Sequence, residues 1–466
     1  MNILKYLLWN GGGVENRLDP LYYTDVKSLI EKSKFPLRKI KEFVKDLKSG
    51  FGAGKQDQAA EEDGIIQIRP TNLDNNGLLK FDKNVYVPKS WATPNATLRY
   101  GDIIFNNTNS QELVGKTGYF DLDDANYVFS NHITRIRVNE RIVMPKYLQI
   151  IFNFYQSKQV FYAICTNWNN QSGIGNELLL NLSVPIPPLS IQHEIVEKMD
   201  MAYQHKKLKE AESAQILSNI DDYILDRLGI EKVTAETDIQ SRIFYTDFCK
   251  VVGNRLDPNF YRKEFETIIT NLGVFDVKKL TDIVNFSDET WNGEAYFETH
   301  FPYIEISEIN ILYGEIQNIN MIPKNEAPSR ARMIVRNDDI IISTTRPSRG
   351  AIAYVKSEPN EIKIASTGFA VLRDLKTNLI EKDFLFHWLR HSYTLRQMEQ
   401  RSSGGSYPAI TTEELRQVLV PLPPLSIQRE IAQAIREMRA KAKDLQGSAN
   451  DLVEDMKREI EGMIMG

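Results

Sequence analysis

Two groups of side chains have the residue types of a metal site. Asp339, with Glu361-Ile362-Lys363 further on, offers two carboxylates and a lysine, the set that can hold Mg²⁺ and polarise a phosphate. Asp102, the repeat counterpart of Asp339, has no Glu-x-Lys in register, so we interpret this group as a strand-end turn and a solvated strand. His387 and His391 stand four residues apart on an expected helix, but no third ligand is evident. We interpret this pair as a surface or packing pair.

Two further motifs could be mistaken for transfer chemistry. Asp19-Pro20-Leu21-Tyr22 and Asp257-Pro258-Asn259-Phe260 lack the second proline of the Asp/Asn-Pro-Pro-Tyr/Phe motif with which amino-methyltransferases present a backbone oxygen to the target amine. Ser49 to Lys55 lacks the first glycine and the final Ser/Thr of a phosphate-binding loop. We interpret it as a flexible loop that contacts a polyanion, with an ordinary surface loop as the alternative.

The sequence segments that position these residues occur twice in the chain. Residues 184–195 read VPIPPLSIQHEI and residues 420–431 read VPLPPLSIQREI, so ten of twelve positions are identical at an offset of 236. Asn16-Arg17-Leu18-Asp19-Pro20 recurs at 254–258, and the segment Leu98 to Ile104 is similar in sequence to Val335 to Ile341. Three anchors in the same order at a nearly constant offset indicate a tandem duplication.

The composition is that of a folded protein of several domains. The chain has 466 residues, of which 42% are hydrophobic and 26% charged, and no apolar run approaches the roughly 20 residues of a membrane span. Two cysteines cannot form a disulfide framework, so we expect a cytoplasmic protein. The net charge of −5 excludes a general basic coat but leaves local basic patches open.

Each copy combines an α+β domain with a long helix. Short runs such as Ile65–Ile68, Asp102–Phe105 and Tyr303–Ile306 predict strands, and Tyr147–Phe161 and Phe384–Gln400 predict helices. A long helix is expected after each Pro-Pro pair, with Ser190 and Ser426 as N-caps and no proline before Gly229 in the first copy. The expected α+β domains are residues 1–185 and 238–421, and the expected helical regions are residues 186–237 and 422–466.

The two long helices carry apolar residues at heptad spacing, although the first is polar in its middle, at Lys206, Lys209 and Ser213. Two such helices in one chain most simply pair with each other in antiparallel orientation, which would place the two α+β domains at opposite ends of a rod. An independent homodimer seam is the alternative. The residues expected to pair the helices or to bind a partner are Ile195, Met199, Ile216, Ile220, Ile224, Ile431, Ile435, Met438, Leu445, Leu452 and Met456.

The motif PLPPLSIQREI, placed after an α+β domain and opening a long helix, resembles the hallmark of the DNA specificity subunits of type I restriction-modification systems. The likeness covers almost the whole chain, including the Asn-Arg-Leu-Asp-Pro openings and the glycine-rich turns at 170–175 and 402–408. The resemblance implies two α+β target-recognition domains separated by two long helices that pair as an antiparallel coiled coil, a pseudo-twofold tandem repeat.

The resemblance further implies a non-catalytic subunit that reads an asymmetric, bipartite sequence of double-stranded DNA, one half-site per recognition domain. Two adenine-N6 methyltransferase subunits would bind around the helices, and restriction/translocase subunits would join for cleavage. The partner subunits would then bind S-adenosylmethionine, ATP and Mg²⁺. This chain is expected to hold no cofactor or metal and to make no membrane contact. A stand-alone DNA-binding adaptor of another defence complex is an alternative, and a coiled-coil scaffold with carbohydrate- or protein-binding heads is another.

Base reading needs polar and cationic side chains on loops that enter a groove. The best single stretch is Thr344-Thr345-Arg346-Pro347-Ser348-Arg349-Gly350, the register counterpart of Asn107-Thr108-Asn109 through Lys116. The predicted DNA-binding residues are Lys55, Arg69, Thr71, Asn72, Asn107, Thr108, Asn109, Lys116, Arg330, Arg332, Thr344, Thr345, Arg346, Ser348 and Arg349.

Overall fold

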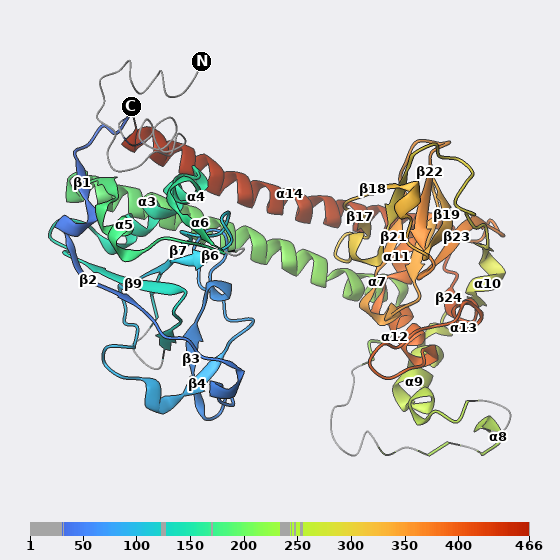
Figure 1. Cartoon of the computed structure of the whole chain (residues 1–466). Helices are drawn as coiled ribbons and strands as arrows, with labels where there is room; N and C mark the ends of the chain where they lie inside the picture. Colours follow the sequence, from blue (N-terminus) through green and yellow to red (C-terminus); the bar gives the residue numbers. More distant parts are fainter. Residues whose placement is uncertain are drawn as a thin grey trace. The chain divides into compact units, whose positions relative to one another are not determined.

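The computed structural model in Figure 1 describes residues 30, 32–122, 127–168, 171–233, 243, 245–246, 248–251 and 255–465. The opening motif at 16–20 and the tyrosines that follow it lie outside the described residues. The chain divides into two units, one of residues 1–208 and 448–466 and the other of residues 209–447. Among the described residues, no helix is long and apolar enough to cross a membrane.

The first unit contains the first α+β domain. Its helices are α3 (Pro145–Ser157), α4 (Val160–Ile164), α5 (Asn176–Asn181) and the first part of α6 (Leu189–Ser218). Its strands are β1 (Leu37–Lys39), β2 (Val44–Ser49), β3 (Gly64–Ile68), β4 (Tyr86–Pro88), β5 (Ile103–Asn106), β6 (Thr108–Asn109), β7 (Thr117–Tyr119), β8 (Tyr127–Phe129), β9 (Ile133–Val138), β10 (Thr166–Trp168), β11 (Gln171–Gly173) and β12 (Ser183–Pro185).

The second unit contains the second α+β domain. Its helices are α7 (Ile220–Leu228), α8 (Phe248–Val251), α9 (Lys263–Leu272), α10 (Leu280–Ile283), α11 (Lys382–Leu389), α12 (Ser392–Arg401), α13 (Thr412–Arg416) and most of α14 (Leu425–Ile464). Its strands are β13 (Val277–Lys279), β14 (Val284–Ser287), β15 (His300–Ile304), β16 (Ile309–Asn310), β17 (Glu315–Ile316), β18 (Asn320–Pro323), β19 (Ala331–Arg336), β20 (Ile340–Ser343), β21 (Ile352–Tyr354), β22 (Ile362–Ser366), β23 (Phe369–Leu375) and β24 (Leu419–Pro421).

The sheets of the two domains have the same plan, which confirms the duplication at the level of strand order. The antiparallel sheet β2-β9-β5-β7 of the first domain corresponds to β14-β23-β20-β21 of the second, and the small pair β1-β12 corresponds to β13-β24. In both domains a second sheet contains one parallel pair, β3 with β8 and β15 with β22. The predicted strands at 65–68, 102–105 and 303–306 lie within or overlap β3, β5 and β15.

One repeated anchor is explained by a buried aspartate. Asp102 and Asp339 are each 1% exposed, and each accepts a hydrogen bond from the backbone N–H three residues earlier, at 2.9 and 2.8 Å. Arg137 on β9 donates two hydrogen bonds to Asp102, at 2.5 and 2.9 Å, and Arg373 on β23 pairs with Asp339 at 3.0 Å. A buried carboxylate requires such pairing, so the aspartate joins a turn to the neighbouring strand in both domains.

The Pro-Pro-Leu-Ser-Ile-Gln anchor is explained by its glutamine. Gln192 is fully buried; its amide nitrogen donates to the carbonyl oxygens of Ile142 (3.0 Å) and Pro187 (2.9 Å), and its amide oxygen accepts from Met144 N–H (2.8 Å). Met144 directly precedes α3, so the glutamine fixes the start of the domain's helix against the start of α6.

Gln428 makes the same three contacts in the second domain, with Leu379 O at 2.9 Å, Pro423 O at 2.7 Å and Glu381 N–H at 2.8 Å. We call the two sets the glutamine clasps.

The long helices begin two residues earlier than predicted. α6 starts at Leu189 and α14 at Leu425, and the carbonyls of Pro188 and Pro424 accept the first helical hydrogen bonds. The prediction of Ser190 and Ser426 as N-caps is therefore wrong, because both serines lie inside the first turn. The first helix is also interrupted at Asn219, between α6 and α7, whereas the sequence predicted a continuous helix to Gly229.

Two shorter helices are also interrupted where the sequence predicted continuity. In the stretch 147–161, Gln159 adopts a left-handed backbone conformation with φ of 59°, which separates α3 from α4. In the stretch 384–400, His391 has an extended backbone and accepts a hydrogen bond from Tyr393 N–H, so that it caps α12.

Within each unit the long helices pair in antiparallel orientation. In the first unit, Lys198 forms an ion pair with Glu459 at 2.6 Å and Lys206 donates to Asn450 at 2.8 Å. Residues further along α6 therefore contact residues earlier in α14. In the second unit, Glu212 pairs with Lys441 and Arg227 with Glu430. The predicted antiparallel pairing is confirmed in both units.

The polar middle of α6 is accommodated by specific contacts. Ser213 is fully buried and donates to the carbonyl oxygen of Ala442 at 2.8 Å. The apolar ends of the seam pack into the domain cores as well as onto each other: Ile195 and Met199 belong to the core of the first domain, and Ile431 and Ile435 to that of the second. The predicted seam residues Ile220 and Ile224 are buried, whereas Ile216, Met438, Leu445, Leu452 and Met456 are half-buried.

Candidate nucleic-acid interface

In each domain the end of a central strand meets the glycine-rich turn. In the first, β6, just beyond β5, pairs with β11, and β11 pairs with β10 to form a small sheet. In the second, Thr345, just beyond β20, bridges to Ala409, which also bridges to Ser403. The strand-end loop and the turn therefore form one continuous surface in each domain, and we call it the loop–turn face.

Two adjoining hollows mark the loop–turn face of the first domain. One, of about 290 Å³, is lined by the backbone of Gly52–Gly54 and by Arg69 and His132. The other, of about 310 Å³, is lined by Thr108, Trp168 and neighbours, and Asn131 lines both hollows.

Both hollows have mixed polar and apolar linings, and Trp168, which is 48% exposed, places an aromatic ring in the second one. Backbone, amide and cationic groups beside an exposed ring are the side-chain types that contact phosphates and base edges.

Arg69 connects the glycine-rich loop to β3. Its Nε donates to Gln67 Oε1 at 2.9 Å and its Nη2 donates to Ala53 O at 3.0 Å. Burial lowers the pKa of the Arg69 guanidinium from its ordinary value. The loop itself is tied down at Gly50, where an added Cβ would lie 2.0 Å from the carbonyl oxygen of Phe129. The predicted flexible loop is thus anchored at one end by a glycine and in its middle by an arginine.

The loop–turn face of the second domain is built around Arg346. Its backbone is left-handed, with φ of 48°, and its N–H donates to Pro408 O at 2.7 Å. Its guanidinium lies 4.1 Å above the ring of Tyr407 and donates to Ser406 O at 2.9 Å. Tyr407 is 69% exposed, so the arginine and tyrosine together present a cation–π stack to solvent.

The predicted DNA-binding residues fall into three groups by exposure. Lys55, Thr71, Arg330, Arg332, Ser348 and Arg349 are exposed, and Arg69, Thr108, Asn109, Lys116, Thr344, Thr345 and Arg346 are half-buried. Lys116 is separate from the two hollows of the first domain; it donates to Asn75 at 2.5 Å, and desolvation lowers its pKa.

Asn72 and Asn107, the third group, are 1% and 7% exposed. Asn72 donates to Lys80 O and accepts from Arg69 N–H, and Asn107 donates to Thr134 Oγ1. These contacts engage the side-chain amides inside the domain, although Asn107 also lines the second hollow. The DNA contact of the two asparagines stays a prediction.

Sequence reasoning did not select Asn131, His132, Trp168, Asn176 or Tyr407, all of which lie on the loop–turn faces. For the two aromatic residues a signal existed, because each lies in or beside a glycine-rich turn. An aromatic residue in a polar turn has no core to join, so it points to a binding surface.

The metal-like motifs have structural partners. Asp339 pairs with Arg373, and Lys363, which is 4% exposed in its side chain, pairs with Glu361 at 2.6 Å. His391 stacks on Trp388 at 4.9 Å, and His387 accepts from Arg439. Among the described residues no group of three or more His, Cys, Asp or Glu could hold a metal ion.

The sequences of both repeats match a known family. The model of the type I restriction modification DNA specificity domain matches residues 33–218 and again residues 271–453. The chain belongs to this family. The prediction made from the Pro-Pro-Leu-Ser-Ile-Gln motif is confirmed, and the matched ranges are the two repeats.

The specificity domain occurs in relatives from archaea and bacteria. The chain is 26% identical over 376 residues to the MjaX specificity subunit of a type I restriction enzyme from Methanocaldococcus jannaschii, covering 78% of this chain and 74% of the relative. It is 23% identical over 324 residues to the EcoBI specificity subunit of Escherichia coli, covering 67% and 65%.

Among solved structures, the S subunit of a type I restriction-modification system from M. genitalium is 14% identical, with a TM-score of 0.44 over 93% of this chain and 97% of that one. A chain from a solved structure of the type I R-M system is 17% identical, with a TM-score of 0.49 over 92% and 97%.

Proposed function

We propose that this protein is the DNA specificity subunit of a type I restriction-modification complex and that it reads an asymmetric target in two parts. The observation that carries the proposal is the pair of specificity domains, which share their framework and differ in their loop–turn faces. A shared framework gives both domains the same way of meeting DNA, and different side chains on that framework select different bases.

The differences between the two faces support unequal half-sites. The first domain offers two hollows that share Asn131, one of them with an exposed tryptophan, whereas the second offers the Arg346–Tyr407 stack followed by the exposed Ser348 and Arg349. Amides pair well with adenine edges and arginine with guanine edges. The two domains therefore select different base edges.

The chain acts without catalysing the reaction in this proposal. Its relatives are named specificity subunits, and Asp339, Glu361 and Lys363 of its metal-like motif are engaged in structural ion pairs. Adenine-N6 methylation would be performed by two methyltransferase subunits bound around the paired helices, and cleavage by restriction/translocase subunits. S-adenosylmethionine, ATP and Mg²⁺ would be held by those partners, and the assembled complex would work in the cytoplasm.

The test is single-molecule sequencing of genomic DNA from the source organism, with and without this gene. The expected result is the loss of N6-methyladenine from one split, asymmetric motif on both strands at once. A matched control restores the gene with Arg346→Ala, which should alter methylation through one half-site only. An unchanged set of methylated motifs would contradict the proposal and favour a DNA-binding adaptor that directs no methylation.

A further inference from the structure

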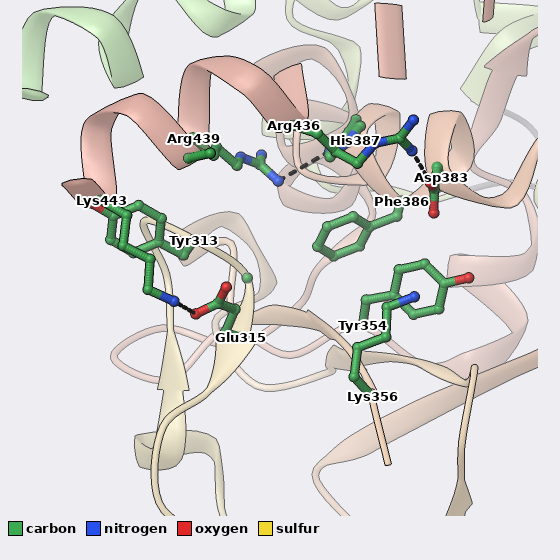
Figure 2. Close-up of a pocket in the computed structure, with 12 residues that line it drawn as sticks. Tyr313, Glu315, Tyr354, Lys356, Asp383, Phe386, His387, Arg436, Arg439 and Lys443 are labelled. Carbon is green, nitrogen blue, oxygen red and sulfur yellow. Dashed lines mark hydrogen bonds and ion pairs between the residues drawn. The ribbon is translucent and has the colours of Figure 1, made fainter. Parts of the chain in front are cut away.

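A cationic hollow of about 340 Å³ lies in the second unit, on the side of the domain where α11 meets α14 (Figure 2). Figure 2 shows Arg436, Arg439 and Lys443 along α14, with Tyr354 and Lys356 facing them from the end of β21. We call this space the α14 hollow. It is distinct from the loop–turn face, with which it shares no lining residue.

The α14 hollow has more positive than negative charge. Lys443 pairs with Glu315 at 2.8 Å, and Arg436 pairs with Asp383. Among the residues that the structure describes, no carboxylate pairs with Lys356 or Arg439. Four cations and two carboxylates line the space, so the lining has two more positive than negative charges. Asp338 acts on Lys356, and Asp221 on Arg439, from outside the lining and without forming an ion pair with them.

Arg439 is held in place by neutral partners. Its guanidinium donates to His387 Nδ1 at 3.0 Å and lies 5.7 Å from the centre of the Phe386 ring. Burial, with the neighbouring Arg439 and Arg390, lowers the pKa of His387 well below its ordinary value, so the imidazole is neutral and accepts this hydrogen bond. The Nε of Arg439 is buried and has no hydrogen-bond partner among the described residues.

A second arginine increases the positive charge behind the hollow. Arg390 lies 5.3 Å from the same Phe386 ring, and its Nη1 is likewise buried without a partner among the described residues. Burial lowers the pKa of Arg439 to about 10 and that of Arg390 to about 9, and both side chains remain charged at neutral pH. Arg439 lines the hollow, so an anion bound there can supply the acceptor that its guanidinium lacks, while Arg390 adds positive charge from behind.

The first unit shows that the fold does not need this charge. At the same distance from the start of α6, Tyr203 replaces Arg439 and Asp200 replaces Arg436, and Asn153 on α3 stands where the second repeat has Arg390. The corresponding space is only about 60 Å³ and is lined mainly by amides and apolar groups. Its one cation, Lys457, bonds to Asn76 Oδ1 at 3.0 Å and to Glu454 at 2.7 Å.

We propose that the α14 hollow binds the phosphate group of a small molecule, one per chain. Phosphate fits the charge better than carboxylate does, because a dianion matches both surplus cations whereas a carboxylate would leave one unpaired. Arginine and lysine are the side chains that hold phosphate, and here they are fixed in advance by aromatic rings: Lys356 lies 3.7 Å from the Tyr354 ring. The cation then loses little freedom when the ligand binds.

The test is calorimetric titration of the full chain with sodium pyrophosphate at constant ionic strength. One equivalent is expected to bind, and Lys356→Gln should weaken binding by about tenfold because it removes one of the two surplus charges. Lys356 is exposed, so this variant should fold normally. Arg439→Met, which keeps an apolar contact with Phe386, should abolish binding.

The matched control is Lys207→Gln, at an exposed lysine of α6 that corresponds in the repeat to Lys443. It should leave pyrophosphate binding unchanged. Absence of binding, equal binding by wild type and Lys356→Gln, or binding of acetate as tight as that of pyrophosphate would each overturn the proposal. Binding of target DNA by Lys356→Gln is expected to be normal, so the outcome is independent of the proposed function.

Discussion

The two repeats carry the same ion pair with its charges exchanged. On the first, Lys146 of α3 pairs with Asp200 of α6 at 2.7 Å, and on the second, Asp383 of α11 pairs with Arg436 of α14. The four residues stand at the same positions counted from the starts of their helices. A duplicated framework therefore keeps the contact and leaves its polarity free, because the attraction is equal either way.

The exchange of charges in this ion pair also changes which lysine lies on the neighbouring tyrosine ring. In the first repeat the lysine lies 5.4 Å from the Tyr119 ring, whereas in the second the equivalent ring, Tyr354, carries Lys356 instead. The glutamine clasps are the same in both repeats, and each repeat keeps an arginine on its buried aspartate. Contacts at the surface of the framework have diverged, and the α14 hollow is one result of that divergence.

The largest effect is expected from removing a glutamine clasp. Gln192→Ala leaves one N–H and two carbonyl groups without partners beside the start of α3, which should lower the free energy of unfolding by about 3 kcal/mol. Gln428→Ala should have the same effect on the second unit. Urea unfolding gives the energy, and hydrogen exchange shows which unit is affected. Gln204→Ala, at an exposed glutamine of α6, is the control and should cost less than about 0.5 kcal/mol.

Removing the buried aspartate should destabilise the two repeats by different amounts. Arg137 donates to Asp102, whereas Arg373 donates to Glu289 as well as to Asp339. Asp102→Ala is therefore expected to cost about 3 kcal/mol and Asp339→Ala about 2 kcal/mol, because only the second arginine keeps a carboxylate partner. Adding Glu289→Gln to Asp339→Ala should bring the cost to that of Asp102→Ala. Equal costs for the two single variants would contradict this account.

A smaller effect is expected on the loop–turn faces. Arg346→Ala removes the cation from the stack on Tyr407 and should weaken recognition of one half-site by about tenfold, the value of one good base contact. Trp168→Ala should act on the other half-site alone. Binding to DNA in which each half-site is scrambled in turn measures the two effects. Equal loss at both half-sites from either substitution would show that the two faces do not read separately.

The smallest effect is expected from the exchanged ion pair itself. Arg436 and Asp383 are both partly exposed, so Asp383→Lys should lower the free energy of unfolding by less than about 1 kcal/mol. The double variant Asp383→Lys with Arg436→Asp, which copies the first repeat, should recover the wild-type value in a thermal or urea titration. Arg436 also donates to Gln433 Oε1 at 2.7 Å, so failure to recover would mean that this second contact adds to stability.

Much of the framework could be predicted from the sequence, because repeated motifs impose the same local structure twice. The Pro-Pro-Leu-Ser-Ile-Gln segments located the long helices, although the caps were placed two residues late, since the second proline of each pair, and not the serine, precedes the first helical residue. The breaks at Asn219 and His391 were missed because neither involves proline or glycine.

The side-chain roles were harder to predict. Asn72 and Asn107 have the chemistry of base contacts, and only tertiary packing shows that their amides point into the domain. The glutamine of the motif was recognised as repeated, but its three partners lie 5 and about 50 residues away in sequence, which no local pattern reveals. Arg436 and Arg439 are exposed-face residue types on α14, and only the packing of α14 against α11 shows that they line a hollow.

The path of α14 has a consequence for biosynthesis. The last turns of this helix complete the core of the first unit, to which Val453, Ile460 and Ile464 belong, although the rest of that unit ends at Leu208, roughly 240 positions earlier. A nascent chain folds from its N-terminus as it leaves the ribosome. The first repeat is thus made first but finished after the second, and until then its exposed core is a substrate for chaperones.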